Sequence, residues 1–182
     1  MARIYLVRHG KAAAGWGEDV DPGLDEAGRE QAEEVARKLT PLGPLSIISS
    51  PLARARETAA PLARKWGVGV AIEKRVSEVP SPTTDLKDRA GWLGKLMISE
   101  WSSVEPELRA WRNGVIEALS EQEKDAVVFT HYIAINAAMG AAVGDGRVVC
   151  FSPGNGSVTV MDADNAKLSL IERGVEAHSR VV

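Results

Sequence analysis

The chain has 182 residues, a size typical of one globular domain, and we expect residues 1–182 to form a single domain. Its net charge is only -3, so we expect no broad positive field that would bind nucleic acid or a membrane surface. The single cysteine, Cys150, excludes an intrachain disulfide and a cysteine metal cluster. No apolar run approaches membrane-spanning length, and we expect a cytoplasmic protein.

The first apolar run, Ile4–Val7, has the composition of a buried strand and leads directly into Arg8-His9-Gly10. A helix is predicted after Asp25, which can cap its N-terminus, because apolar residues recur there at spacings of three and four. Pro41 and Gly43 are expected to end that helix. The chain is thus predicted to begin with a strand, a loop that carries Arg8-His9-Gly10, and a helix.

The next segment repeats this order. Residues 45–49 predict a second strand, and Ser50-Pro51 supplies an N-cap and a proline suited to a first helical turn. We expect helix from there to Gly67, followed by a third strand at residues 68–72. Glu78 then begins a proline-rich segment that cannot be helical.

Two amphipathic helices are predicted within residues 82–122, which we interpret as a short helical cap insertion. Ala126–Thr130 predicts a buried strand that runs into His131 and an alanine-rich helix ending near Gly144. The last predicted strands are at residues 148–151, 157–161 and 168–171. This alternation predicts a three-layer α/β/α sandwich with a mostly parallel central sheet.

Four side chains of the predicted fold follow the carboxyl ends of strands: Arg8, His9, Arg54 and His131. In open α/β sheets the ligand crevice lies outside these strand ends, so we expect the four to converge. Guanidinium groups make paired, charge-assisted hydrogen bonds to the oxygens of a tetrahedral dianion. Each residue alone has a structural interpretation, as a surface arginine or a hydrogen-bonded core histidine. Their convergence is what indicates a phosphate site.

Three motifs occur in a fixed order along the chain: Arg8-His9-Gly10, then Asp21-Pro22-Gly23-Leu24 before a helix with Gly28 and Ala32, then Ser49-Ser50-Pro51-Leu52-Ala53-Arg54-Ala55-Arg56-Glu57-Thr58-Ala59. Together with Glu78 after the third strand and His131 after a later one, this order resembles the histidine phosphatase superfamily, also called the phosphoglycerate mutase-like family. The resemblance spans almost the whole chain, and the short length is similar to that of phosphohistidine phosphatases.

The resemblance implies a metal-independent phosphatase, without a cofactor, that hydrolyses a phosphomonoester or phosphoramidate through a phosphohistidine at His9. Arg8, Arg54 and His131 would bind the three non-bridging oxygens. Glu78 would be the general acid and then the general base, with the neighbouring carboxylate Glu73 as an alternative. The substrate would be a phosphorylated small molecule or a phosphoprotein, and the motifs do not choose between them.

The chain departs from the commonest family pattern at two positions. Lys11-Ala12 stands where Glu-Thr is usual, and Tyr132 stands where glycine is common, which we interpret as changes at the rim of the site. Alternative functions are a phosphoglycerate-type mutase and a non-catalytic phospho-ligand binding or regulatory protein. The short segment between Glu78 and His131 favours hydrolysis over transfer, and the presence of all five catalytic-type residues favours an enzyme.

The charges around His9 support one further hypothesis. His9 must be neutral to attack phosphorus, and two neighbouring arginines should lower its pKa by repulsion between like charges. Activity should then persist at mildly acidic pH. Lys11 and Asp21 are interpreted as solvated loop charges near the mouth of the site, and the sequence assigns no role to His178.

Overall fold

The computed structural model describes residues 1–177, so His178 lies outside the described residues. Within them six strands form one sheet in the order β3-β2-β4-β1-β5-β6. Their bounds are β1 (Ala2–Arg8), β2 (Ser46–Ser49), β3 (Val70–Ile72), β4 (Ala126–Thr130), β5 (Val158–Asp164) and β6 (Lys167–Glu172). Strands β3, β2, β4 and β1 run parallel, whereas β5 is antiparallel to both of its neighbours.

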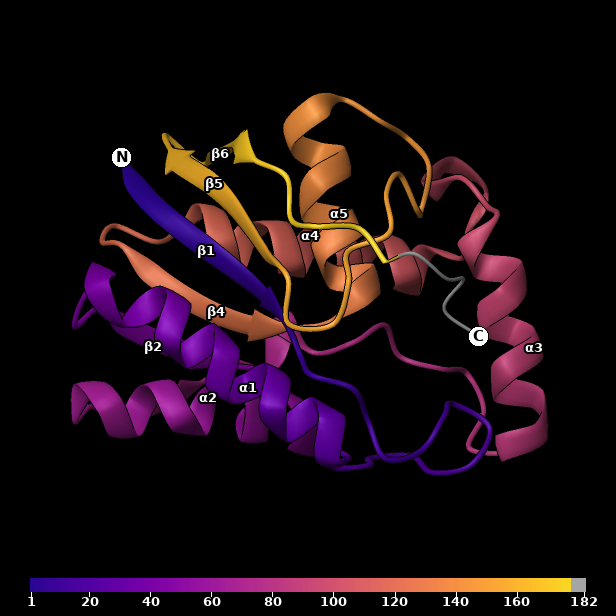
Figure 1. The fold of residues 1–182 in the computed structure, drawn as a ribbon. Helices are drawn as coiled ribbons and strands as arrows, with labels where there is room; N and C mark the ends of the chain where they lie inside the picture. Colours follow the sequence, from indigo (N-terminus) through magenta and orange to yellow (C-terminus); the bar gives the residue numbers. More distant parts are fainter. Residues whose placement is uncertain (178–182) are drawn as a thin grey trace.

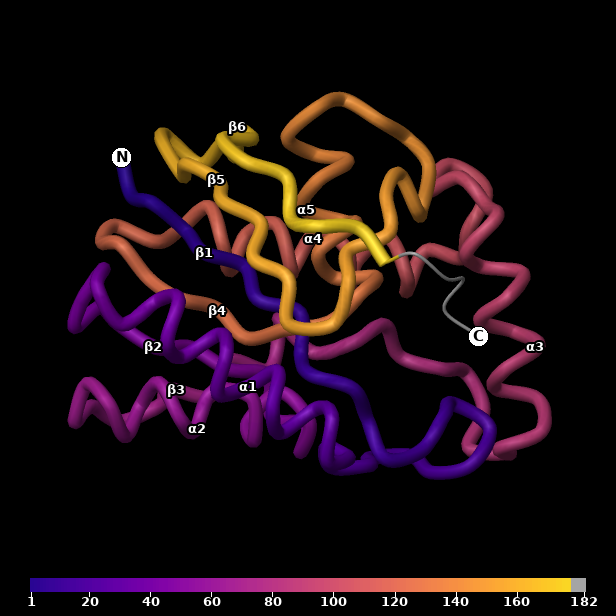
Figure 2. Tube along the Cα trace, in the orientation of Figure 1, coloured from indigo at the N-terminus to yellow at the C-terminus, as the bar shows by residue number. Residues whose placement is uncertain are grey.

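Helices cover both faces of this sheet, which confirms the predicted three-layer sandwich (Figure 1). α1 (Glu26–Leu39) and α2 (Ala53–Trp66) pack together on one face, and α4 (Pro106–Ser120) and α5 (Tyr132–Val143) pack on the other. α3 (Leu86–Met97) lies beyond the carboxyl ends of β1 and β4, away from the sheet (Figure 2). Short 3₁₀ turns are η1 (Thr40–Leu42), η2 (Lys74–Val76) and η3 (Trp101–Ser103). No helix in residues 1–177 has the length and apolar character needed to span a membrane.

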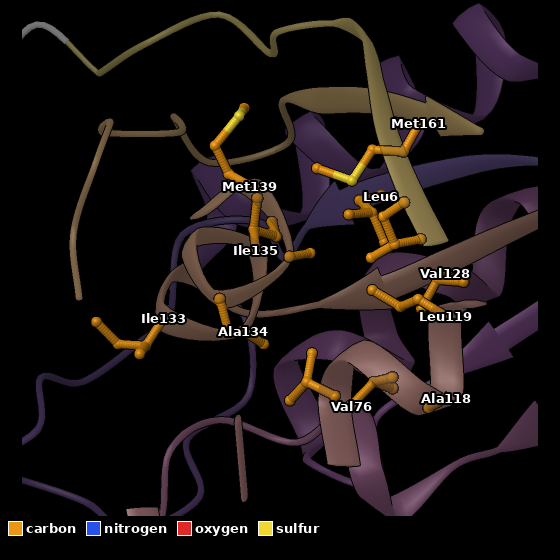
Figure 3. Packing of buried hydrophobic residues seen from close by; sticks show 14 of the residues in the cluster. Leu6, Val76, Ala118, Leu119, Val128, Ile133, Ala134, Ile135, Met139 and Met161 are labelled. Atoms are coloured by element: carbon orange, nitrogen blue, oxygen red, sulfur yellow. The ribbon is translucent and has the colours of Figure 1, made fainter. Parts of the chain in front are cut away.

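Alternate side chains of the central strands pack against opposite helical layers, as the two-residue period of a strand requires. Leu6 and Val128 belong to the cluster around α5, where Met139 also packs (Figure 3). Val7 and Phe129 belong to the cluster formed with α1 and α2. Burial on both faces fixes β1 and β4, so the loops that follow them begin at defined positions.

The predicted strand at residues 148–151 is wrong, because this segment forms a loop. Its backbone donors bond to groups outside any strand. The amides of Cys150 and Phe151 donate to Oδ1 of the buried Asn136, at 2.8 and 3.1 Å. The amide of Val148 donates to the carbonyl of Ser99 at 3.0 Å. A side chain of α5 therefore replaces the neighbouring strand that the apolar run would need.

The predicted N-cap of the second helix, Ser50, is also wrong, since α2 begins at Ala53 with Leu52 as its N-cap. Leu52 offers no side-chain acceptor to the first turn. Instead, Oδ1 of Asp21 accepts a hydrogen bond from the amide of Ala53 at 2.8 Å. A residue from a distant loop therefore satisfies this helix end.

The loop after β1 packs directly on the first turn of α1. Asp25 caps that helix as predicted, accepting from the amide of Gly28 at 2.8 Å. A Cβ atom on Gly28 would lie 2.1 Å from the carbonyl oxygen of Lys11, and one on Gly10 would lie 2.5 Å from the carbonyl oxygen of Gly28. These distances leave no room for a side chain, so both glycines are needed for the loop after His9 to reach its position.

Replacing Gly28 with alanine should therefore lower the free energy of unfolding by about 1–3 kcal/mol, the usual cost of overpacking. Urea unfolding followed by circular dichroism measures this. The matched control is Gly94→Ala, because Gly94 lies in α3 with no atom within 4 Å of its Cβ position. There alanine should be neutral or stabilise by up to about 1 kcal/mol. Equal stabilities of the two variants would contradict the packing argument.

Candidate active site

A cavity of about 620 Å³ opens where β1 and β4 end. Arg8, His9, Arg54 and Glu78 all line it. His131 is fully buried behind them, with its ring centroid 5.1 Å from that of His9. The structure thus brings together the five residues that the sequence singled out, from four separate segments of the chain.

The hydrogen bonds of His9 select one tautomer of its ring. Nδ1 lies 2.7 Å from the backbone oxygen of Gly10, which can accept but cannot donate, so Nδ1 carries the proton. Nε2 accepts a hydrogen bond from Nε of Arg54 at 3.1 Å. Nε2 is therefore unprotonated, and it is the nitrogen with a lone pair available for chemistry.

Burial lowers the pKa of His9 well below its ordinary value of 6.5, and the charges of Arg54 and Arg8 lower this pKa further. The direction agrees with the hypothesis drawn from the sequence. The larger cause, however, is removal of the ring from water, which penalises the charged imidazolium form. His9 therefore stays neutral at a pH where an exposed histidine is half protonated.

Arg8 is held at its edge and at its face. Its Nη1 donates to the carbonyl of Pro153 at 2.8 Å, and its guanidinium carbon lies 5.0 Å from the centroid of the Tyr132 ring. The hydroxyl of Tyr132 lies 3.0 Å from Oγ of Ser152. Burial lowers the pKa of Arg8 to about 10, so the group remains charged at neutral pH. Tyr132 thus contacts Arg8, a residue proposed to bind phosphate. The interpretation of Tyr132 as a rim residue did not predict this contact.

His131 is bonded on one side of its ring only. Its Nε2 lies 2.7 Å from Oγ of Ser50, whereas its Nδ1 is buried without a hydrogen-bond partner among residues 1–177. Burial lowers the pKa of His131 well below the ordinary value, so the ring is neutral. If the Ser50 hydroxyl donates to Nε2, then Nδ1 carries the proton and is a free donor.

The carboxyl group of Glu78 lies at the N-terminus of α5. It accepts from the amide of Val79 at 3.0 Å and from the amide of Ile133 at 3.2 Å. Burial raises the pKa of Glu78, although these amides and the two arginines act in the opposite direction. Glu73, the alternative carboxylate, bonds to Arg75 at 3.0 Å, and this contact lowers the pKa of Glu73. Glu73 does not line the cavity. Of these two carboxyl groups, Glu78 is therefore the one that the cavity reaches.

The turn at residues 152–157 supports the catalytic loop, a role that the sequence did not reveal. Nδ2 of Asn155 donates to the carbonyl of His9 at 3.0 Å, and the amide of Gly156 donates to the carbonyl of Arg8 at 3.0 Å. From α2, Oγ1 of Thr58 accepts from the amide of Gly10 at 2.9 Å. The backbone of Arg8-His9-Gly10 is thus held by two distant segments.

The two loop charges near the mouth have protein partners. Nζ of Lys11 lies 3.2 Å from a carboxylate oxygen of Asp25, and Asp21 holds the N-terminus of α2 as described above. Among residues 1–177, no group of three or more His, Cys, Asp or Glu side chains is arranged to hold a metal ion.

Comparison with known sequences identifies relatives for this site. Residues 4–89 match the family described as "Histidine phosphatase superfamily (branch 1)". A "Probable phosphoglycerate mutase GpmB" of Erwinia tasmaniensis is 30% identical over 121 residues, which are 64% of this chain and 51% of that protein. A "Glucosyl-3-phosphoglycerate phosphatase" of Mycolicibacterium vanbaalenii is 33% identical over 117 residues, 62% of this chain and 48% of that protein. The chain spans about half the length of these curated relatives.

Solved structures share the fold. A mycobacterial glucosyl-3-phosphoglycerate phosphatase in complex with VO3 has a TM-score of 0.70 at 24% identity, over 94% of this chain and 98% of that chain. A phosphoserine phosphatase from Entamoeba histolytica, in complex with 3-phosphoglyceric acid, has a TM-score of 0.73 at 21% identity, over 98% of both chains. These matches show that the chain resembles the histidine phosphatase superfamily, as its ordered motifs predict. The finer resemblance to phosphohistidine phosphatases stays a prediction.

The tautomer and pKa of His9 can be measured directly. Nitrogen-detected NMR of the ring should show a neutral, Nδ1-protonated imidazole at pH 6.5, because burial lowers the pKa below this ordinary value. In Arg54→Gln the pKa of His9 should rise, since that variant removes the nearer positive charge and the hydrogen bond to Nε2. A protonation midpoint at or above 6.5 in the wild type would contradict the assigned state.

Proposed function

We propose that the protein is a metal-independent phosphatase that hydrolyses a phosphomonoester or phosphoramidate through a covalent phosphohistidine at His9. The observation that carries this proposal is the state of the His9 ring. Its Nε2 is unprotonated and lies 3.1 Å from Nε of Arg54, in a cavity that also contains Arg8 and Glu78. A neutral imidazole beside two guanidinium groups is arranged to attack a bound phosphoryl group.

The phosphoryl group would be bound by charge and by hydrogen bonds. Arg8 and Arg54 would donate charge-assisted bonds to its oxygens, so Arg54 would leave Nε2 of His9 and free that lone pair. His131 would donate from Nδ1, the buried nitrogen without a partner among the described residues. These donors stabilise the charge that develops in the transition state of phosphoryl transfer.

In the first step Nε2 of His9 would form a bond to phosphorus while the bond from phosphorus to the leaving oxygen breaks. That oxygen would take the proton of Glu78, whose pKa is raised by burial. In the second step a water molecule would attack phosphorus and give a proton to the Glu78 carboxylate. The phosphorus–nitrogen bond then breaks, and its electron pair returns to His9.

Mutation of His9 tests the nucleophile. With an aryl phosphate and a chelator present, the wild type should be active and inhibited by vanadate, an analogue of the transition state. His9→Ala should lose at least about 10³-fold in kcat, because no other nucleophile replaces the imidazole. The unfolding midpoint of the variant serves as the check that it is folded.

Full activity in His9→Ala, or complete loss of wild-type activity on chelation, would contradict this mechanism. Vanadate or phosphate binding without hydrolysis would instead favour the phospho-ligand binding protein. A phosphoglycerate-type mutase would convert 3-phosphoglycerate to 2-phosphoglycerate faster than it releases inorganic phosphate, which product analysis distinguishes.

Mutation of Glu78 tests the acid and base. In Glu78→Gln, hydrolysis of the phosphoenzyme should slow by about 10²- to 10⁴-fold, because no carboxylate activates water. With an aryl phosphate, whose leaving group needs little protonation, the phosphohistidine should accumulate and be visible by mass spectrometry of the intact protein. Glu73→Gln is the matched control and should show neither effect, since Glu73 lies outside the cavity and bonds to Arg75. Equal rates in Glu78→Gln and the wild type would exclude Glu78 from this role.

A further inference from the structure

Arg89 of α3 is a buried arginine that the proposed mechanism does not use. It is only 8% exposed, and it lines the same cavity as His9. Its Nη1 donates a long hydrogen bond of 3.3 Å to the carbonyl of Asp19, and its guanidinium carbon lies 4.7 Å from the centroid of a Trp16 ring. No carboxylate among residues 1–177 forms a salt bridge with it. A buried charge without a countercharge is costly, so its retention needs an explanation.

The carboxylates that line the same rim are engaged elsewhere. Glu18 accepts from the amide of Gly15 at 2.7 Å, and Asp19 accepts from the amide of Asp21 at 3.0 Å. Asp25 accepts from the amide of Gly28 and pairs with the Lys11 ammonium. Each acidic group of the rim therefore has a donor of its own within the loop or the adjacent helix.

The other nitrogens of Arg89 remain open to the cavity. Nε and Nη2 have no protein acceptor among residues 1–177, yet they are not among the buried atoms that lack a partner. Solvent therefore reaches them, and Arg89 lines the cavity. An edge of a guanidinium that presents two free N–H groups fits the paired oxygens of a carboxylate or phosphate.

Arg89 also shares its cavity with the proposed catalytic groups and acts on one of them through its charge. Burial is the main cause that lowers the pKa of Arg54, and the charge of Arg89 lowers that pKa further. Apolar side chains of Trp16, Leu93 and Met97 line the same cavity. The cavity thus holds Arg8 and Arg54 at the proposed phosphate site and a further cation, Arg89, on the side of α3.

We propose that Arg89 binds a second anionic group, a carboxylate or a phosphate, on the leaving group of the substrate. This inference rests on the proposed phosphatase function and names the class of substrate: a phosphate ester whose alcohol part is itself an anion. The group to be cleaved lies against Arg8 and Arg54, and the second anion lies against the free edge of Arg89. The competing explanation is a structural one, in which Arg89 only ties the loop at Trp16 and Asp19 to α3.

The test compares esters that differ in the second anion. The probes are phosphate esters of two-, three- and four-carbon hydroxy acids, 3-phosphoglycerate among them, and the matching neutral alcohols, such as glycerol 3-phosphate. A matching series of bisphosphates, in which a second phosphate replaces the carboxylate, shows which of the two anions Arg89 prefers. For at least one anionic series the wild type should show a kcat/KM about tenfold or more above that for the neutral ester.

The Arg89→Gln variant should remove this preference while leaving kcat/KM for the neutral esters and an aryl phosphate within about twofold of the wild type. Arg89→Lys should keep part of this preference, because lysine retains the positive charge but lacks the planar guanidinium group. Arg109→Gln is the matched control. Arg109 also donates to a backbone carbonyl, that of Val104, but lies outside the cavity, so its loss should change none of these rates.

Two results would overturn the proposal. One is a wild type that prefers neither anionic series, and the other is an Arg89→Gln variant that loses activity equally on anionic and neutral esters, as a structural tie would. Failure of the proposed function is seen separately, as absence of aryl phosphate hydrolysis. In that case calorimetric binding of the same esters tests whether Arg89 binds the second anion. Equal affinities for the anionic esters in the wild type and Arg89→Gln would contradict the second anion site.

Discussion

The hydrogen bond from Arg54 to His9 is the interaction on which the site depends. A guanidinium can only donate, so Nε2 of His9 must accept, and the ring proton must lie on Nδ1, where the Gly10 carbonyl receives it. This geometry requires Nε of Arg54, on the first turn of α2, to lie 3.1 Å from Nε2 of His9, which follows β1. The close approach of Gly10 to Gly28 and the support of the His9 backbone by Asn155 hold that meeting point in place.

Burial acts on the acid and the base in opposite directions, and both directions suit phosphoryl transfer. It lowers the pKa of His9 and raises the pKa of Glu78, so removal of water favours a neutral nucleophile and a protonated acid together. Arg8 stays charged, since burial lowers its pKa only to about 10. With His9 neutral, the positive charges beside it are those of Arg8 and Arg54. Two positive charges match a phosphate dianion, which is the ligand that the proposed mechanism requires.

The sequence predicted the parts of this site that follow from strand order. Apolar runs located the ends of β1 and β4, and the topology of an α/β sheet then required Arg8, His9 and His131 to converge. What it missed depends on contacts between distant segments. Spacing alone could not choose Glu78 over Glu73, because burial and the bond to Arg75 decide between them. The stacking of Tyr132 on Arg8, and the use of Asn136 in place of a strand partner, likewise leave no local pattern.

In the proposed function, the site divides into a part that performs the chemistry and a part that selects the substrate. The first part is anchored to strand ends and to α2, and its motifs resemble those of the histidine phosphatase superfamily. The second part consists of the loop after β1 and α3, which meet where Trp16 packs 6.2 Å from Trp92 and against Arg89. Trp16 and Arg89 form no hydrogen bond with the proposed phosphate ligands, so they can change without removing a contact of those residues, whereas Asp21 of the same loop holds the N-terminus of α2. The motifs therefore predict the reaction, whereas the proposed choice of leaving group depends on this second part, where Arg89 would supply the charge.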